Sequence, residues 1–236
     1  MVGALSIYRS TIGKKAIMAV TGFIWVGFVF IHMIGNLKMY IGAHDYNVYG
    51  EFLRTVGYPL FPERTLLWIA RIVIFGAVAL HIWAAAALTN QARTSRPSGY
   101  KENNRAQPLY VYASRTMRWG GVIVGLFIVY HILHFTTGTL HNNFIHGDVY
   151  HNVVAGFSVW WVSLIYIVAM GALGLHLFHG VWSMFQTIGW NNSGLTNFWR
   201  LVALVFTAIV IIGNISFPLA VLVGVVAPET TTTLGM

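Results

Sequence analysis

The sequence predicts an all-α integral membrane protein with five transmembrane helices, and two observations favour this fold class. Of the 236 residues, 57% are hydrophobic and only 8% are charged, with a mean hydropathy of +0.67. A soluble domain carries roughly 25% charged residues. The chain also contains apolar runs of about 20 residues, the length that a helix needs to cross ~30 Å of hydrocarbon. A lipid bilayer is therefore the expected environment.

The expected spans follow one another along a single domain, residues 1–236. They cover roughly 16–37, 66–88, 119–140, 158–185 and 200–226. The first is too long for the apolar region of a signal peptide, lacks a cleavage site of small residues after it, and carries a histidine. The connections are too short and too polar to fold alone, so no second domain is expected.

Three connecting or terminal segments have distinct expected characters. Residues 94–107 are rich in turn-forming residues and predict a solvated connector. Residues 44–54 alternate polar positions with aromatic and leucine positions, which favours a short helix at the membrane interface. The tail at 230–233 is expected to fray.

The distribution of basic residues predicts the orientation. With five spans, ten of the 14 Lys and Arg residues fall on the side of the N-terminus and five of the six acids on the other side. Because cytoplasmic loops are enriched in Lys and Arg, the N-terminus is expected in the cytoplasm and the C-terminus outside. The net charge of +8 follows from this asymmetry, and no basic stripe interleaved with aromatics indicates nucleic-acid binding.

The chain contains no cysteine. This excludes disulfides, an iron–sulfur cluster held by the chain's own thiolates, a thiol nucleophile and a covalent CxxCH haem attachment. Any haem must therefore be bound non-covalently.

Four histidines, each in a different apolar run, are the strongest functional signal. His32, His81, His131 and His176 occupy four successive expected helices. Because hydrocarbon cannot solvate an imidazole, an intramembrane histidine marks a functional site by default. Four such residues predict two pairs of axial ligands for two stacked b-type haems inside a bundle of four helices. Scattered polar residues along a transport path are the alternative.

Depth along the helices predicts how the four histidines pair. His32 lies about 25 Å outward along the first span and His131 about 20 Å along the third, so both belong to the outer half. His81 lies roughly 13 Å from the cytoplasmic end of its span and His176 roughly 15 Å, so both belong to the inner half. The expected pairs are therefore His32 with His131 and His81 with His176.

Two doublets remain open at this point. His134 follows His131 by three residues, and His179 follows His176 by three, so both members share a helix face. The member that does not bind iron could contact a propionate or a quinone, or form hydrogen bonds within the bundle.

Two further features admit two interpretations each. Glycines within the spans, such as Gly22, Gly27 and Gly125, fit close helix packing or leave room for a flat macrocycle. The segment 141–151 contains His141, His146, Asp148 and His151. A zinc or copper site is conceivable there, but the spacing matches no stringent pattern and a wet loop explains it as well.

Several local patterns resemble one family, the cytochrome b membrane anchor of succinate:quinone oxidoreductases, in its five-helix, di-haem, single-subunit type. The N-terminal SIYRSTIGKKAIMAVTG is similar to the family's cytoplasmic end, and His32 is followed four residues later by Asn36. His81 lies near the inner end of its span, as in the family.

The third and fourth spans extend this resemblance. They contain, in order, Arg118, Gly120, Gly121 and His131, then His176, His179, Gly180 and Trp182. Matching these motifs selects His131 over His134 and His176 over His179 as ligands, although relatives often carry Asn where this chain has His179.

The resemblance implies two haem b groups, a membrane quinone that is menaquinone rather than ubiquinone, and two partners, a flavoprotein that oxidises succinate or reduces fumarate and an iron–sulfur subunit. It implies the cytoplasmic membrane of a prokaryote, and a higher oligomer of the complex stays open. By position, haem propionates are expected to meet Arg115 and Arg118 at the inner side and Asn36 and Lys38 at the outer side, with His134 and His179 as further cofactor contacts. Quinone candidates are Ser6, Arg9 and Ser10 inside, and His44 and Glu51 outside.

Two rival functions are retained. One is the di-haem cytochrome b anchor of a hydrogenase, formate dehydrogenase or nitrate reductase, whose histidine order matches less well. The other is a transporter that uses membrane histidines without haem, which predicts discontinuous helices and intramembrane carboxylates. The expected spans contain essentially no carboxylates.

Overall fold

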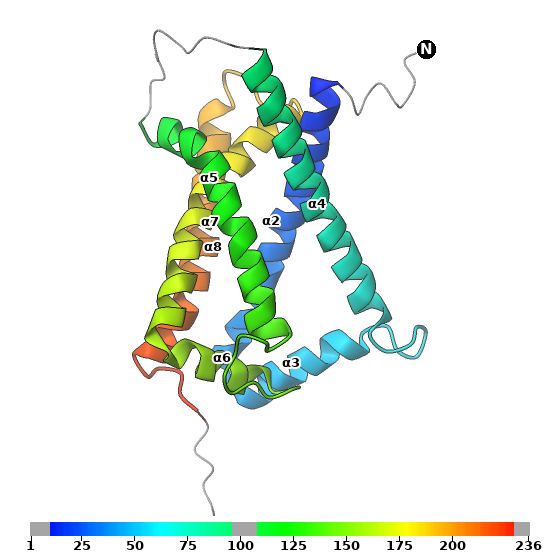
Figure 1. Ribbon diagram of the computed structural model, residues 1–236, viewed down its shortest axis with the longest axis vertical. Coiled ribbons are helices and arrows are strands. Elements are labelled where there is room, and N and C mark those ends of the chain that lie inside the picture. The colour runs from blue at the N-terminus through cyan, green and yellow to red at the C-terminus, as the bar shows by residue number, and fades with distance from the viewer. Residues whose placement is uncertain (1–9, 96–107, 229–236) are drawn as a thin grey trace, which may run out of the picture. The chain divides into compact units, whose positions relative to one another are not determined.

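The structure is a computed structural model that describes residues 10–95 and 108–228 (Figure 1). Throughout these residues the secondary structure is helical, with turns between the helices and no strand. The elements in chain order are α2 (Thr11–Asn36), η1 (Leu37–Tyr40), α3 (Ala43–Thr55), α4 (Thr65–Thr94), α5 (Pro108–His131), η2 (Ile132–Thr136), α6 (Val149–Ser158), α7 (Trp160–Thr187) and α8 (Thr196–Leu222). The all-α fold class is confirmed.

Five helical segments in the described part of the chain are long and apolar enough to cross a membrane. They are Thr11–Tyr40, Thr65–Thr94, Thr116–Thr136, Trp160–Thr187 and Thr196–Leu222. Large apolar side chains on them are widely exposed, for example Leu126 at 68% and Ile212 at 69%. Contiguous apolar surface of this kind is unfavourable in water but matches a lipid environment. The chain is therefore a multi-pass membrane protein.

The expected third span differs from the observed one at its C-terminal end. Hydropathy extends the span to residue 140, whereas the helical segment ends at Thr136. Its last turn, η2, is a π-helix in which the amide of Thr137 donates to the carbonyl of Ile132. Gly138 then adopts φ +75°, a left-handed conformation that ends the helix. A hydropathy window cannot detect this backbone turn.

Contacts divide the chain into two compact units, and each is described separately. Unit 1 comprises Met1–Phe30, Trp68–Met117 and Leu175–Thr207, and unit 2 comprises Ile31–Leu67, Arg118–Gly174 and Ala208–Met236. Helices α2, α5, α7 and α8 contribute residues to both units. The prediction that residues 1–236 form one domain stays a prediction.

Unit 1 is held by an apolar cluster and by polar contacts at the start of α2. Ala113, Phe178, Val181, Trp182 and Ala203 form the cluster. The Gln91 side chain donates to the Thr11 hydroxyl at 2.8 Å and accepts from Lys14 Nζ at 3.4 Å, so α4 is tied to α2. These contacts fix the two helices that flank the candidate site in this unit.

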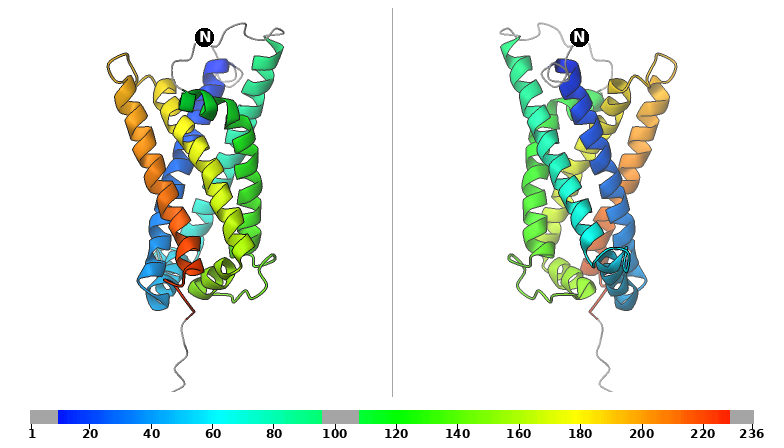
Figure 2. Two further views of the ribbon diagram at one scale, coloured as in Figure 1. Left: turned by 90° about the vertical axis from the view of Figure 1, so that its left-hand side faces the viewer. Right: turned by 90° about the vertical axis from the view of Figure 1, so that its right-hand side faces the viewer.

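Unit 2 contains two short helices, α3 and α6, that pack side by side (Figures 1 and 2). The Asn47 side chain links them, donating to Asp148 Oδ1 and accepting from the Tyr150 amide, both at 3.0 Å. Asp148 also caps α6 by accepting from the His151 amide at 2.9 Å. The prediction of a helix at 44–54 is confirmed by α3, whereas α6 was not predicted.

Candidate functional site

In unit 1, His81 on α4 and His176 on α7 lie next to each other. Their ring centroids are 6.2 Å apart, with the ring planes at 60°. These are the two histidines that depth counting assigns to the inner half of the membrane. Residues 95 positions apart in sequence thus converge inside an apolar unit.

Helix α2 fixes the orientation of the His81 ring. The buried Thr21 hydroxyl lies 3.2 Å from His81 Nδ1. Gly22, one residue on, allows the close approach, because a Cβ at this position would lie 3.3 Å from His81 Cε1. Nδ1 of His176 is buried, and the Met117 backbone interacts with the same ring.

In unit 2, His32 on α2 and His131 at the end of α5 form the second pair. Their centroids are 5.8 Å apart and their planes are perpendicular. Tyr166 on α7 places its hydroxyl 3.4 Å from Nδ1 of His131. The Phe127 and Phe135 rings lie 5.9 Å from His131 on the same segment. The second pair therefore also lies in an aromatic, apolar environment.

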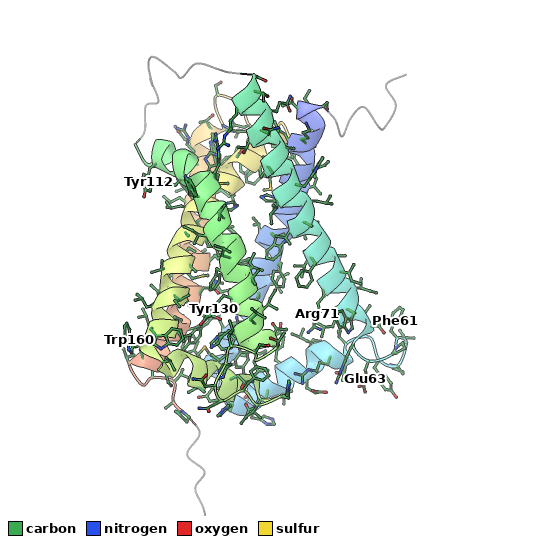
Figure 3. The ribbon with its side chains drawn as sticks, viewed as in Figure 1. Phe61, Glu63, Arg71, Tyr112, Tyr130 and Trp160 are labelled. Atoms are coloured by element: carbon green, nitrogen blue, oxygen red, sulfur yellow. The ribbon has the colours of Figure 1, made fainter. Side chains whose placement is uncertain are left out.

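His134 shares Tyr166 and Phe135 with His131 but has further neighbours of its own. Its Nδ1 lies 3.1 Å from the Tyr166 hydroxyl, and its ring stacks on Tyr130, labelled on α5 in Figure 3, and on His141. Only 2% of His134 is exposed. Because the π-turn begins directly after His131, the two histidines do not present their rings as an ordinary α-helical i, i+3 pair would. His134 packs in the aromatic cluster, and His131 faces His32.

Both pairs have the separation that one metal ion between two imidazoles requires. Two ring nitrogens bound to an ion at about 2 Å each place the ring centroids roughly 6 Å apart. The measured separations are 5.8 Å and 6.2 Å. No cluster of three or more His, Cys, Asp or Glu residues suited to a metal occurs in the described part of the chain. A metal held here would take two ligands from the chain, and a planar macrocycle would supply the others.

The helix glycines support both interpretations of their role, at different positions. Gly35 packs closely, since a Cβ there would collide with the Tyr49 ring at 2.7 Å, and Gly120 lies against the Ala172 carbonyl. By contrast, a Cβ at the half-buried Gly27 or Gly125 would meet nothing within 4 Å. The second group leaves the space that a bulky ligand would need beside the backbone.

The residues expected to contact propionates occupy varied environments. Asn36 accepts a hydrogen bond from Tyr46 at 2.7 Å through Oδ1, and Lys38 lies 5.6 Å from the centre of the Tyr49 ring. Burial raises the pKa of Tyr46, with a smaller contribution from Tyr49, so this hydroxyl stays a donor. Arg118 is exposed at the start of the third span. The Arg115 side chain lies outside the described residues.

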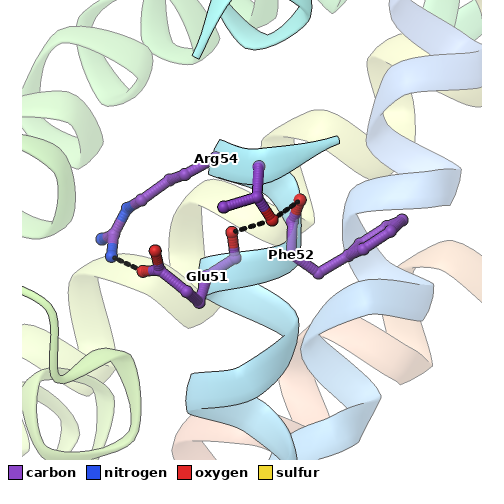
Figure 4. A network of polar contacts seen from close by, with 4 residues as sticks. Glu51, Phe52 and Arg54 are labelled. Atoms are coloured by element: carbon purple, nitrogen blue, oxygen red, sulfur yellow. Dashed lines mark hydrogen bonds and ion pairs between the residues drawn. The ribbon is translucent and has the colours of Figure 1, made fainter. Parts of the chain in front are cut away.

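The quinone candidates are not brought together. Ser6 and Arg9 lie outside the described residues, and Ser10 caps α2 by accepting from the Gly13 amide at 3.0 Å. Glu51 forms an ion pair with Arg54 at 2.9 Å near the end of α3 (Figure 4). His44 is exposed at the start of α3.

The polar segment 141–151 has structural contacts. His141 Nε2 lies 2.9 Å from the Asn152 carbonyl, and its Nδ1 accepts from the Asn143 amide. His151 Nε2 lies 3.0 Å from the Asn143 carbonyl. His146 is exposed and packs edge-on against Phe144. Together with the cap formed by Asp148, these contacts hold the turn before α6.

Two residues at the site, Thr21 and Tyr166, were missed in the sequence. Both are hydroxyl-bearing residues within apolar spans, and Tyr166 is 6% exposed. Most Tyr and Trp residues of the chain lie near span ends, where an interfacial belt explains them. Tyr166 lies six residues after the start of α7, so the same belt accounts for it and no signal in the sequence distinguished it. Comparison with known protein families, with curated proteins and with solved structures finds no match to this chain.

Proposed function

We propose that this chain is the haem b membrane anchor of a succinate:quinone oxidoreductase. In this proposal it binds two haems and passes electrons from a cytoplasmic iron–sulfur subunit to a membrane quinone, menaquinone in preference to ubiquinone. The observation that carries the proposal is the occurrence of two histidine pairs, one in each unit, with ring separations suited to bis-imidazole ligation.

His32 and His131 would hold one haem, and His81 and His176 the other. Bound haem supplies a one-electron redox centre, and ligation by two imidazoles leaves no open position on the iron. The chain's own residues hold the imidazoles at the right separation, exclude water and orient the rings. Their apolar surroundings suit electron transfer rather than ligand exchange.

The neighbours of the doublets support the choice of ligands. His131 faces His32, whereas His134 is stacked between Tyr130 and His141. The ring of His176 lies beside that of His81. The roles of Asn36, Lys38, Arg115, Arg118, His134 and His179 toward propionates or quinone belong to the same proposal.

Replacing single histidines tests the ligand assignment. His81→Ala or His176→Ala is expected to remove one haem, and His32→Ala or His131→Ala the other, as measured by reduced-minus-oxidised visible spectra of the purified protein. His146→Ala is the matched control, because this exposed histidine should leave both haems in place. Loss of a haem in His179→Ala but not in His176→Ala would contradict the assignment within that doublet.

The partners are tested by purification from native membranes in mild detergent. A co-purifying flavoprotein and iron–sulfur protein with succinate:quinone activity would support the proposal. A hydrogenase, formate dehydrogenase or nitrate reductase subunit would assign the chain to a different quinone-linked enzyme. A chain without haem would overturn the proposal and favour a transporter.

A further inference from the structure

Each histidine pair has one member whose Nδ1 lies against a hydroxyl group. In unit 1 the hydroxyl belongs to Thr21, at 3.2 Å from His81. In unit 2 it belongs to Tyr166, at 3.4 Å from His131. Both hydroxyl-bearing residues are buried, with 5% and 6% of their surfaces exposed. Buried polar groups of this kind must satisfy one another, because water cannot reach them.

The hydrogen-bond pattern around Thr21 determines the tautomer of His81. The Thr21 hydroxyl has a single hydrogen, and it donates this hydrogen to the Ile17 carbonyl at 2.7 Å. With that hydrogen on the Ile17 carbonyl, the Thr21 oxygen accepts from Nδ1 of His81, and the Met18 backbone is a second hydrogen-bond partner of the same ring. The lone pair of the neutral imidazole is therefore on Nε2, which is left free to bind a metal.

Tyr166 forms a similar chain with a different last acceptor. Its hydroxyl lies between Nδ1 of His131 at 3.4 Å and Nδ1 of His134 at 3.1 Å. One hydroxyl hydrogen cannot serve both nitrogens, so at least one histidine must donate to the oxygen. If His131 binds iron through Nε2, its Nδ1 donates a hydrogen bond to the Tyr166 oxygen. The Tyr166 hydroxyl then donates its hydrogen bond to Nδ1 of His134. This direction assigns His134 the role of acceptor for Tyr166.

We propose that Thr21 and Tyr166 are positioning residues, each fixing the tautomer and ring orientation of one axial ligand and making that imidazole a stronger electron donor. The inference rests on the proposed function, since it concerns ligands to haem iron. Accepting the Nδ1 hydrogen increases the basicity of the ligand, which stabilises the ferric state and lowers the midpoint potential of that haem. The series of hydrogen bonds in unit 1 ends on the Ile17 carbonyl, and the series in unit 2 ends on the His134 imidazole.

Redox titration of the purified, haem-loaded protein tests this inference. Thr21→Val is expected to raise the midpoint potential of the haem that His81→Ala removes and to leave the other unchanged. Tyr166→Phe should do the same for the haem that His131→Ala removes. The expected size is on the order of a tenfold change in the reduction equilibrium, about 59 mV for one electron. Both haems should be retained.

The chain offers matched controls for both substitutions. Thr207 and Tyr130 have buried hydroxyls without a hydrogen-bond partner among the described residues, so Thr207→Val and Tyr130→Phe should leave both potentials unchanged. Thr21→Ser keeps a hydroxyl and should restore the wild-type potential. A Thr21→Val shift no larger than that of Thr207→Val, or no rescue by Thr21→Ser, would overturn the inference for Thr21. A Tyr166→Phe shift no larger than that of Tyr130→Phe would overturn it for Tyr166. Absence of haem from the wild-type protein would instead overturn the proposed function.

Discussion

At the scale of single residues, the histidine pairs depend on small neighbours as much as on the imidazoles. Gly22 illustrates this, because α2 approaches the His81 ring at a position where even a methyl group would be tight. Thr21 is adjacent in sequence and contacts the same ring. One turn of α2 therefore supplies both the space and the hydrogen-bond partner for His81.

We expect Gly22→Ala to reduce occupancy of the haem held by His81 and His176. The added Cβ would lie 3.3 Å from His81 Cε1, so the ring must shift away from its present position. Gly76→Ala on α4 is the control, since this glycine is exposed and its Cβ would meet no atom within 4 Å. Both substitutions favour the helix by about 1 kcal/mol, so propensity cannot explain a difference between them. Haem content per chain is the measurement, and equal content in the two variants would contradict the prediction.

At the scale of elements, the spans were predictable and the segments between them were not. Long apolar runs determine the five spans through hydropathy alone, and the pattern of α3 was visible at 44–54. By contrast, α6 begins at the end of the polar, histidine-rich segment 141–151, and it is held by Asn47 from a distant part of the chain. The π-turn after His131 likewise has no signature in the hydropathy pattern. Local sequence patterns do not carry such long-range contacts.

The turn that follows η2 provides a test at this scale. Gly138→Ala is expected to destabilise the protein by more than Gly147→Ala, although both glycines have positive φ values, +75° and +93°. Either substitution introduces backbone strain of about 1–2 kcal/mol. Only at Gly138 would the new Cβ also collide with the Phe144 ring, whereas Gly147 has nothing within 4 Å. Thermal unfolding in detergent measures the difference, and equal melting temperatures would contradict this account of the turn.

The candidate site was only partly accessible from sequence. Counting residues from the charged span ends paired His32 with His131 and His81 with His176, and these are the rings that lie together in the structure. The count could not separate His131 from His134, because the π-turn that distinguishes them is a backbone feature. The roles of Thr21 and Tyr166 were also not predicted, because the hydrogen-bond partner of a hydroxyl in an apolar run is not visible in the sequence.

At the scale of the whole molecule, the distribution of basic residues predicts how the chain is inserted. The absence of cysteine makes this directly testable, because single cysteines can be introduced without background. Asn142 and Ser193 are exposed and lie in successive connections, before α6 and before α8. With the N-terminus in the cytoplasm, Asn142 would be external and Ser193 cytoplasmic.

We therefore expect Asn142→Cys to react with a membrane-impermeant maleimide in intact cells. Ser193→Cys should react only after the membrane is permeabilised. The cysteine-free wild-type chain is the control for labelling of other proteins. The opposite pattern would reverse the orientation and with it the assignment of inner and outer histidine pairs.

The central claim is that each histidine pair holds one haem, and the most direct measurement is the haem b content of the purified wild-type chain. We predict two non-covalent haem b groups per chain, with low-spin bis-imidazole spectra in the oxidised and reduced states. One haem per chain would leave one of the two pairs without its proposed role. A preparation from native membranes that contains no haem would contradict the account.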